Sequence, residues 1–202
     1  FAFAATGVSY RASGSVPGHL GWNPADSAYR FSEWNGDLRV LSFTGNVGWA
    51  TTADTGIAPS PAQLTVLRER SGDATLQPLA TLPNAQRPAR LGKPGEQVRA
   101  VRFVGDRGYV VTFRQVDPLY VLDLADPADP KVAGELELPG FSDRLLPMGD
   151  GLLFGVGRDV DPVSGRMAGV KVALFDVRDA AHPAVLASVT LGMAGSATAA
   201  DY

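Results

Sequence analysis

The 202 residues of this chain include no cysteine and only two histidines, His19 and His182. The absence of cysteine excludes disulfides and thiolate chemistry within the chain, but it leaves the cellular compartment open. Zinc and copper sites draw mainly on cysteine and histidine ligands, so the sequence predicts no such site here. His182 precedes Pro183, and we interpret it as a turn residue.

The chain also lacks long runs of basic residues and long runs of apolar residues. Its formal net charge is −3, only 19% of its residues are charged, and no long basic run occurs. The sequence therefore predicts no nucleic-acid partner. No apolar run reaches the roughly 18 residues of a membrane span, so we expect no span in this chain. The first residues, FAFAATG, lack the positive start of a signal peptide; we interpret them as the middle of a strand with further sequence in front.

Short strand patterns and turn signals are abundant instead. Hydrophobic residues make up 45% of the chain, and 23 glycines and 15 prolines punctuate them. The central region alternates β-branched or aromatic runs with Gly-Asp and Asp-Pro turns, as strands joined by tight turns do. It contains four predicted strands, at residues 98–103, 109–113, 119–124 and 132–138. Four short strands joined in sequence form a meander, which is the form of a propeller blade.

This unit is repeated. PLYVLDLADPADPKVAGELELPG is answered about fifty residues later by KVALFDVRDAAHPAVLASVTLG, which matches Asp123 to Asp176 and Pro130 to Pro183. A weaker copy lies upstream, where EWNGDLRVLSF has the same strand, Gly-Asp turn and strand. A period of this size with four strands per unit predicts an all-β fold, a β-propeller. An all-β sandwich is the alternative.

The repeat divides the chain into one propeller region over residues 1–202. We expect blades at approximately residues 29–82, 98–140 and 141–192, with partial blades at 1–21 and 193–202. Insertions follow the second strand of the first and last complete units, at 44–61 and 159–169. Known propellers use roughly four to eight blades, so we interpret the chain as part of a larger ring.

The string GYVVTFRQVDPLYVLDLADPADPKVAGELELPGFSDRLLPMGDGLLFGVGRDVD resembles a family of bacterial and archaeal proteins predicted to be secreted. Members contain a C-terminal β-propeller domain distantly related to WD40 repeats. ASGSVPGHL, DLRVLSFTGN, KVALFDV and SVTLG are similar to the family in the same order. The resemblance implies a propeller and a secreted, periplasmic or envelope-associated protein, and it carries over no catalytic residues. GWNPADSAYRFSEWNGD departs from the family because it is longer and more polar.

Candidate ligand-binding residues lie beside the insertions and strand ends. Trp49 and Asn46 occupy the first insertion, where an exposed indole could stack on a sugar or a partner side chain, or simply pin the loop. Arg114, Asp117 and Arg158 follow or precede central strands. We expect them near one ring face, where they form either a polar ligand surface or a structural salt bridge between blades.

Two groups of aspartates have a structural and a functional interpretation. Asp159 and Asp161 are weak calcium candidates, because oxygen ligands on a turn suit calcium. However, positions five and twelve of an EF-type loop would be Val163 and Val170, which cannot ligate through their side chains, and a solvated hairpin loop is the alternative. The aspartates that recur with the repeat are interpreted as turn caps; they are Asp117, Asp123, Asp126, Asp129, Asp176 and Asp179.

The sequence thus favours a non-catalytic binding or scaffold propeller of an exported cell-envelope protein, without a cofactor. A protein or glycan at the cell surface is the expected partner, and two fragments could dimerise. The alternative is a propeller hydrolase or lyase whose acidic residues meet at the central channel, roughly 5 to 10 Å apart. A purely structural domain of a secreted protein is a third possibility.

Overall fold

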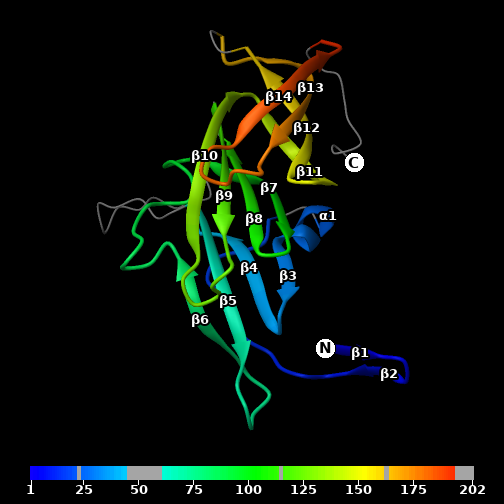
Figure 1. The fold of residues 1–202 in the computed structure, drawn as a ribbon, viewed down its shortest axis with the longest axis vertical. Helices are drawn as coiled ribbons and strands as arrows, with labels where there is room; N and C mark the ends of the chain where they lie inside the picture. The colour runs from blue at the N-terminus through cyan, green and yellow to red at the C-terminus, as the bar shows by residue number, and fades with distance from the viewer. Residues whose placement is uncertain (22–23, 45–60, 114–115, 162–163, 194–202) are drawn as a thin grey trace.

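The fold is described from a computed structural model, which covers residues 1–21, 24–44, 61–113, 116–161 and 164–193. This described part is all-β, as predicted. It contains three four-stranded antiparallel sheets, each in sequence order, and a separate hairpin. The sheets follow one another along the long axis and do not close into a ring (Figure 1).

Each sheet is a meander of consecutive strands. The hairpin consists of β1 (Ala2–Ala4) and β2 (Gly7–Ser9). The first sheet contains β3 (Phe31–Trp34), β4 (Asp37–Phe43), β5 (Ala62–Glu69) and β6 (Leu76–Leu82). The second contains β7 (Gln97–Val104), β8 (Arg107–Phe113), β9 (Val116–Asp123) and β10 (Lys131–Pro139). The third contains β11 (Phe141–Gly149), β12 (Leu152–Val160), β13 (Met167–Asp176) and β14 (Ala184–Leu191).

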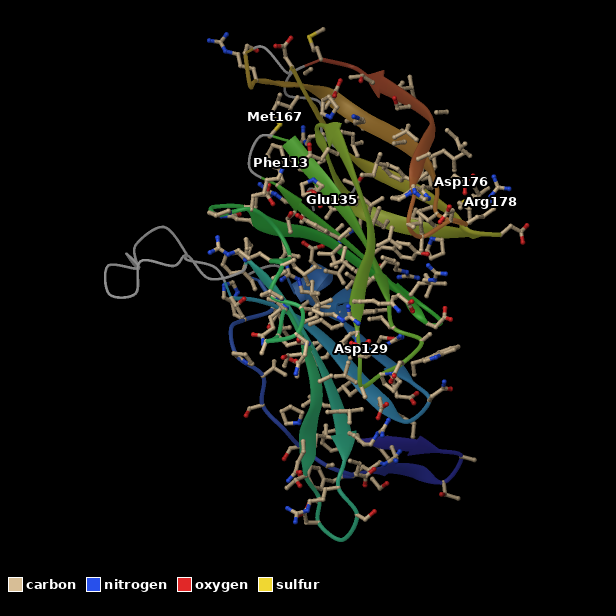
Figure 2. The ribbon with its side chains drawn as sticks, turned by 60° about the vertical axis from the view of Figure 1, so that its left-hand side comes forward. Phe113, Asp129, Glu135, Met167, Asp176 and Arg178 are labelled. Carbon is tan, nitrogen blue, oxygen red and sulfur yellow. The ribbon has the colours of Figure 1, made fainter. Side chains whose placement is uncertain are left out.

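The meander places the loops at two opposite ends of each sheet. Turns between first and second strands and between third and fourth strands lie at one end, which we call the turn end. Figure 2 shows this end at Asp129, Asp176 and Arg178, and the opposite end at Phe113 and Met167. The connections from second to third strands belong to the opposite end, where the residues proposed from the sequence for ligand and calcium binding also cluster in the chain.

The repeated aspartates explain why the turns recur. The backbone N–H groups of Ala125, Ala128 and Ala181 donate to the carboxylates two residues before them, at 3.1, 2.9 and 3.0 Å. Such a side-chain bond stabilises a tight turn, and in the turns of Asp126 and Asp179 a backbone hydrogen bond from residue 129 or 182 accompanies it. The turn-cap interpretation is thereby confirmed for Asp123, Asp126 and Asp179.

The other repeated aspartates differ in the partners of their carboxylates. Asp176 also accepts from the backbone N–H two residues later, that of Arg178, at 3.0 Å, so it is a turn cap too. The carboxylate of Asp129 instead accepts from Arg87 on the connector before β7. His182 lies in the turn of Asp179, 2.9 Å from its carboxylate, which agrees with its interpretation as a turn residue.

We expect the free energy of unfolding to fall as the pH falls from about 4 to about 2. Hydrogen bonds from Arg178 lower the pKa of Asp176 from 3.8 to about 2, and the Arg87 guanidinium lowers the pKa of Asp129. A carboxyl whose pKa is lower in the folded state stabilises the fold above its unfolded pKa, and this contribution is lost on protonation.

Urea unfolding at several pH values measures this pH dependence of stability. Asp176→Asn should flatten the pH dependence between 4 and 2, and an unchanged slope would contradict the assignment.

Burial raises the pKa of Glu135 above 4.5. For a carboxyl with a raised folded pKa, the stability change with pH lies above the unfolded value, so Glu135 does not contribute below pH 4.

The second sheet is buried on both faces. One face packs its apolar residues against the first sheet, and the other packs against the third sheet. On the first interface Leu64 and Val66 meet Val110 and Leu122. On the second interface the rings of Phe113 and Phe141 lie 4.2 Å apart between centroids. The core is therefore a stack of sheets, with the inner strands β7 and β11 in contact.

The two end sheets differ in how their far faces are covered. On the first sheet, Val40 and Thr65 face away from the second sheet and are nevertheless buried. Nearby, Ser13 exchanges backbone hydrogen bonds with Ala74 and Leu76 at the start of β6, and His19 exchanges them with Phe43 at the end of β4. On the third sheet, the far face carries Leu146, Val189 and Leu191, which are 44%, 50% and 53% exposed.

Candidate functional site

The structure tests little of the ligand surface proposed from the sequence. Asn46, Trp49 and Arg114 lie outside the described residues. The backbone of Asp117 pairs with Leu138 in the second sheet, but its side chain is also outside the description. Arg158 is half-buried on β12, where its backbone pairs with Phe141 and Val170. This ligand surface therefore stays a prediction.

The calcium candidates make hydrogen bonds of their own. Asp159 accepts from the Thr190 hydroxyl at 2.6 Å and from the Val160 N–H at 3.0 Å. Asp161 accepts from the Ser164 N–H at 2.7 Å. In the part of the chain that the structure describes, no group of three or more His, Asp or Glu side chains is arranged to hold a metal ion. The Asp159 and Asp161 assignment stays a prediction.

A ligand-sized hollow lies at the turn end of the first sheet. We call it the turn groove. Its volume is about 650 Å³, within the roughly 300–1,000 Å³ of small-molecule sites. It is lined by the β3–β4 turn, the β5–β6 turn and Arg11. The lining residues are Arg11, Asn35, Gly36, Asp37, Arg68, Glu69, Arg70, Ser71, Gly72, Asp73 and Ala74.

Local sequence explains why these turns are exposed and open. Asn35 and Gly36 adopt positive φ angles of 52° and 84°, which asparagine and glycine tolerate better than other residues. Across the groove, Asp73 accepts hydrogen bonds from the backbone N–H and the hydroxyl of Thr75. Both turns are thus set by short-range chemistry, and antiparallel pairing of β4 with β5 brings them to the same end.

Ion pairs hold the charged side chains of the turn groove in place. Arg68 donates from Nε and Nη2 to the two carboxylate oxygens of Asp37, both at 2.7 Å. Asp37 is only 3% exposed, so the bidentate bond compensates its loss of water. Arg11 bonds to Glu69, and Arg70 lies 3.8 Å from Asp73. Three arginines therefore balance three carboxylates, and the groove is polar without a net charge.

A smaller apolar hollow of about 180 Å³ adjoins the turn groove. The two hollows share Arg11, Gly36 and Glu69 in their walls. Leu38 and Leu76 line the smaller one. A ligand in the groove can thus place polar groups among the ion pairs and an apolar face beside the leucines.

Carboxylates also gather on the outer side of the second sheet. Burial and the neighbouring Glu137 raise the pKa of Glu135 on β10, which Figure 2 labels. The buried Glu96 accepts from the Lys93 N–H at 2.7 Å and from the Thr112 hydroxyl at 2.6 Å. Glu96 directly precedes β7, Thr112 lies on β8, and Glu135 and Glu137 lie on β10. The hydrolase or lyase alternative stays a prediction.

Comparison with known proteins decides the family. A sequence model described as "Beta propeller domain" matches residues 1–202. This chain belongs to the β-propeller domain family. The β-propeller predicted from the repeats and the resemblance carried by residues 108–161 are thereby confirmed at the level of the family.

Two archaeal proteins are similar to this β-propeller domain. "Uncharacterized protein MJ1554" of Methanocaldococcus jannaschii is 34% identical over 190 residues, which are 94% of this chain and 26% of that protein. An "Uncharacterized protein" of Archaeoglobus fulgidus is 47% identical over 88 residues, which are 44% of this chain and 13% of that protein. The domain thus spans about a quarter of the first relative's length.

No helix in the described residues is long and apolar enough to cross a membrane.

The sequence reasoning missed the turn groove. The Gly-Asp turn of EWNGDLRVLSF is interpreted from the sequence only as a turn, and Arg11 lies in the predicted partial blade at 1–21. The available signal was the charge pattern Arg68-Glu69-Arg70 at the end of an apolar strand. Nothing in that pattern says that Arg11, nearly sixty residues earlier, completes the wall.

Proposed function

We propose that this domain is a non-catalytic binding module of an exported cell-envelope protein, and that its ligand is an uncharged polar glycan segment. The observation that carries the proposal is the turn groove, which has the volume of a small-molecule site and fixed polar walls. The export and envelope location rest on the resemblance described above.

The charge balance of the groove favours a neutral ligand. Its carboxylates are engaged by arginines, so a strongly charged ligand would have to break ion pairs without replacing them. Sugar hydroxyls both donate and accept, and can bond to the remaining donors and acceptors of an existing ion pair. The adjoining Leu38 and Leu76 offer contact to the apolar face of a sugar ring.

Isothermal titration of the domain with neutral oligomers of N-acetylglucosamine, glucose and mannose tests this proposal. We expect one of them to bind, and Arg70→Ala to weaken that binding at least tenfold. Arg70 is exposed, and exposed ion pairs contribute about 0–1 kcal/mol to stability, so the variant should stay folded.

Arg87→Ala is the matched control, because Arg87 is also an exposed arginine paired with an aspartate, outside the groove. It should bind as the parent does. Binding that survives Arg70→Ala, or no binding of any of the three oligomers, would contradict the proposal. Chromatography of the incubated oligomer should show it intact, and shortened products would instead support the hydrolase or lyase alternative.

A further inference from the structure

A second set of polar groups lies at the inner edge of the sheets, apart from the turn groove. The short α1 (Pro24–Ser27) and η1 (Ala28–Arg30) precede β3 and lie beside β7 (Figure 1). They bring Tyr29 and Arg30 to arginines of the inner strands. We call this group the inner-edge arginines; they are Arg30, Arg99, Arg102 and Arg144.

Tyr29 is the centre of this group. The guanidinium carbons of Arg102 and Arg144 lie 5.2 and 5.4 Å from the centroid of its ring, within the range of a cation–π interaction. Arg102 comes from β7 and Arg144 from β11, so one tyrosine holds cations from two sheets. The Arg144 guanidinium also bonds to Asp26 of α1.

Arg30 is buried with an unused donor. It is 5% exposed, and its Nη2 donates to the Val98 carbonyl at 3.2 Å. Within the described part of the chain its Nη1 is buried and has no hydrogen-bond partner, and the same holds for Nε of Arg99 and of Arg102. Burial lowers the pKa of Arg30 to about 10, a value at which it is still charged at neutral pH. The Arg99 guanidinium lies over the rings of Phe113 and Phe141. Buried donors are normally satisfied, so the unpaired donor of Arg30 points to a missing acceptor.

The local charge gives the sign of that acceptor. Arg30, Arg99 and Arg144 line one small cavity together with Asp26 and Asp143, and Arg102 lies beside it on Tyr29. Four cations against two carboxylates leave an excess of two positive charges. A dianion would balance this excess, and guanidinium groups bind phosphate oxygens with particular strength.

The cavity limits how the anion is placed. Its volume is about 10 Å³, roughly the room for one water-sized group. One oxygen of a tetrahedral anion can occupy it beside Arg30, while the other oxygens remain at the mouth. The mouth is accessible, because Tyr29 is 38% exposed.

We propose that the inner-edge arginines form a binding site for a phosphate group, independent of the glycan groove. One phosphate oxygen takes the place beside Arg30, and Arg102 and Arg144 approach the anion from the two sides held by Tyr29. The site would thus join the inner strands of the second and third sheets through an anion.

Titration with inorganic phosphate, followed by two-dimensional NMR at constant ionic strength, tests this site. We expect saturable shifts of the backbone amides of residues 28–30 and 99–102. Potassium chloride at the same ionic strength should not reproduce them. An absence of saturable shifts with phosphate, or equal shifts with chloride, would overturn the proposal.

Variants separate specific binding from a general charge effect. Arg102→Gln should weaken phosphate binding at least tenfold, and Arg102→Lys should restore part of it. Arg166→Gln removes an exposed arginine of the β12–β13 connection and should leave the affinity unchanged. Equal weakening by Arg166→Gln, or full affinity in a folded Arg102→Gln protein, would contradict the site.

A phosphomonoester such as phosphoserine identifies the source of the anion. Tighter binding of the ester than of inorganic phosphate would show that the site recognises a phosphate group carried by a larger ligand. Weaker binding of the ester would show that the site binds the free ion. Arg70→Ala, which tests the turn groove, should leave phosphate binding intact. The two proposals can therefore fail separately.

Discussion

Val121→Asp is expected to unfold this domain, whereas Leu174→Asp should leave it folded. The two positions are equivalent in the repeat, because each lies two residues before a strand-ending aspartate, Asp123 or Asp176. Val121 is 0% exposed between the second and third sheets. An unpaired buried carboxylate there costs about 3–5 kcal/mol, much of the roughly 5–15 kcal/mol that stabilises a domain.

Leu174 is only half-buried, since no further sheet covers its face in the described residues. Its backbone partner on β14 is Ala187, and the exposed Val189 lies one pair further along on the same face. Full burial of a leucine side chain contributes about 1.5–3 kcal/mol. Because Leu174 is only half-buried, we expect Leu174→Asp to cost less than about 1.5 kcal/mol. Circular dichroism and urea unfolding of the two variants measure the difference.

The same substitution should also reduce self-association. Exposed apolar faces of this kind promote pairing of copies, so light scattering should show less dimer for Leu174→Asp than for the parent at equal concentration. Comparable unfolding of both variants would contradict the assignment of covered and open faces. A parent that is monomeric at all concentrations would contradict the association.

Gly157→Ala is expected to destabilise the third sheet by about 3 kcal/mol. A Cβ atom at this position would lie 1.9 Å from the Phe141 carbonyl oxygen and 2.7 Å from the Ser142 Cα. Both obstacles are backbone atoms of β11, so they cannot rotate away as a side chain would. The β11–β12 ladder has a register shift directly after Ser142, and the alanine would have to widen it. Thermal unfolding measures the loss.

Gly36→Ala is the control for this effect. Gly36 has a φ of +84°, but nothing lies within 4 Å of the position of its Cβ. The expected cost is about 1–2 kcal/mol, from the left-handed backbone alone. If Gly157→Ala proved no worse than Gly36→Ala, the close approach of β11 and β12 would not be a source of stability.

The sequence alone determined the strands and their order. Tyr109 to Phe113 is β-branched and aromatic, and Gly105 before it has the positive φ of 56° that a tight turn uses. Asp123 and Asp176 bond only two residues ahead. Such features depend on neighbouring residues in the chain, so a repeated residue pattern predicts a repeated meander. The repeated meander in turn predicts the propeller family.

Only the tertiary structure decided which residues form a site. Arg11 meets Glu69 in the turn groove, and Arg144 meets Asp26 at the inner edge, although each pair is far apart in the sequence. The pattern of a strand indicates which side chains are apolar. It does not predict whether another sheet packs on the face that carries them. Val121 and Leu174 look alike in the repeat and differ in burial for that reason. The physical cause is that packing and charge pairing depend on distances in space, which the local repeat leaves open.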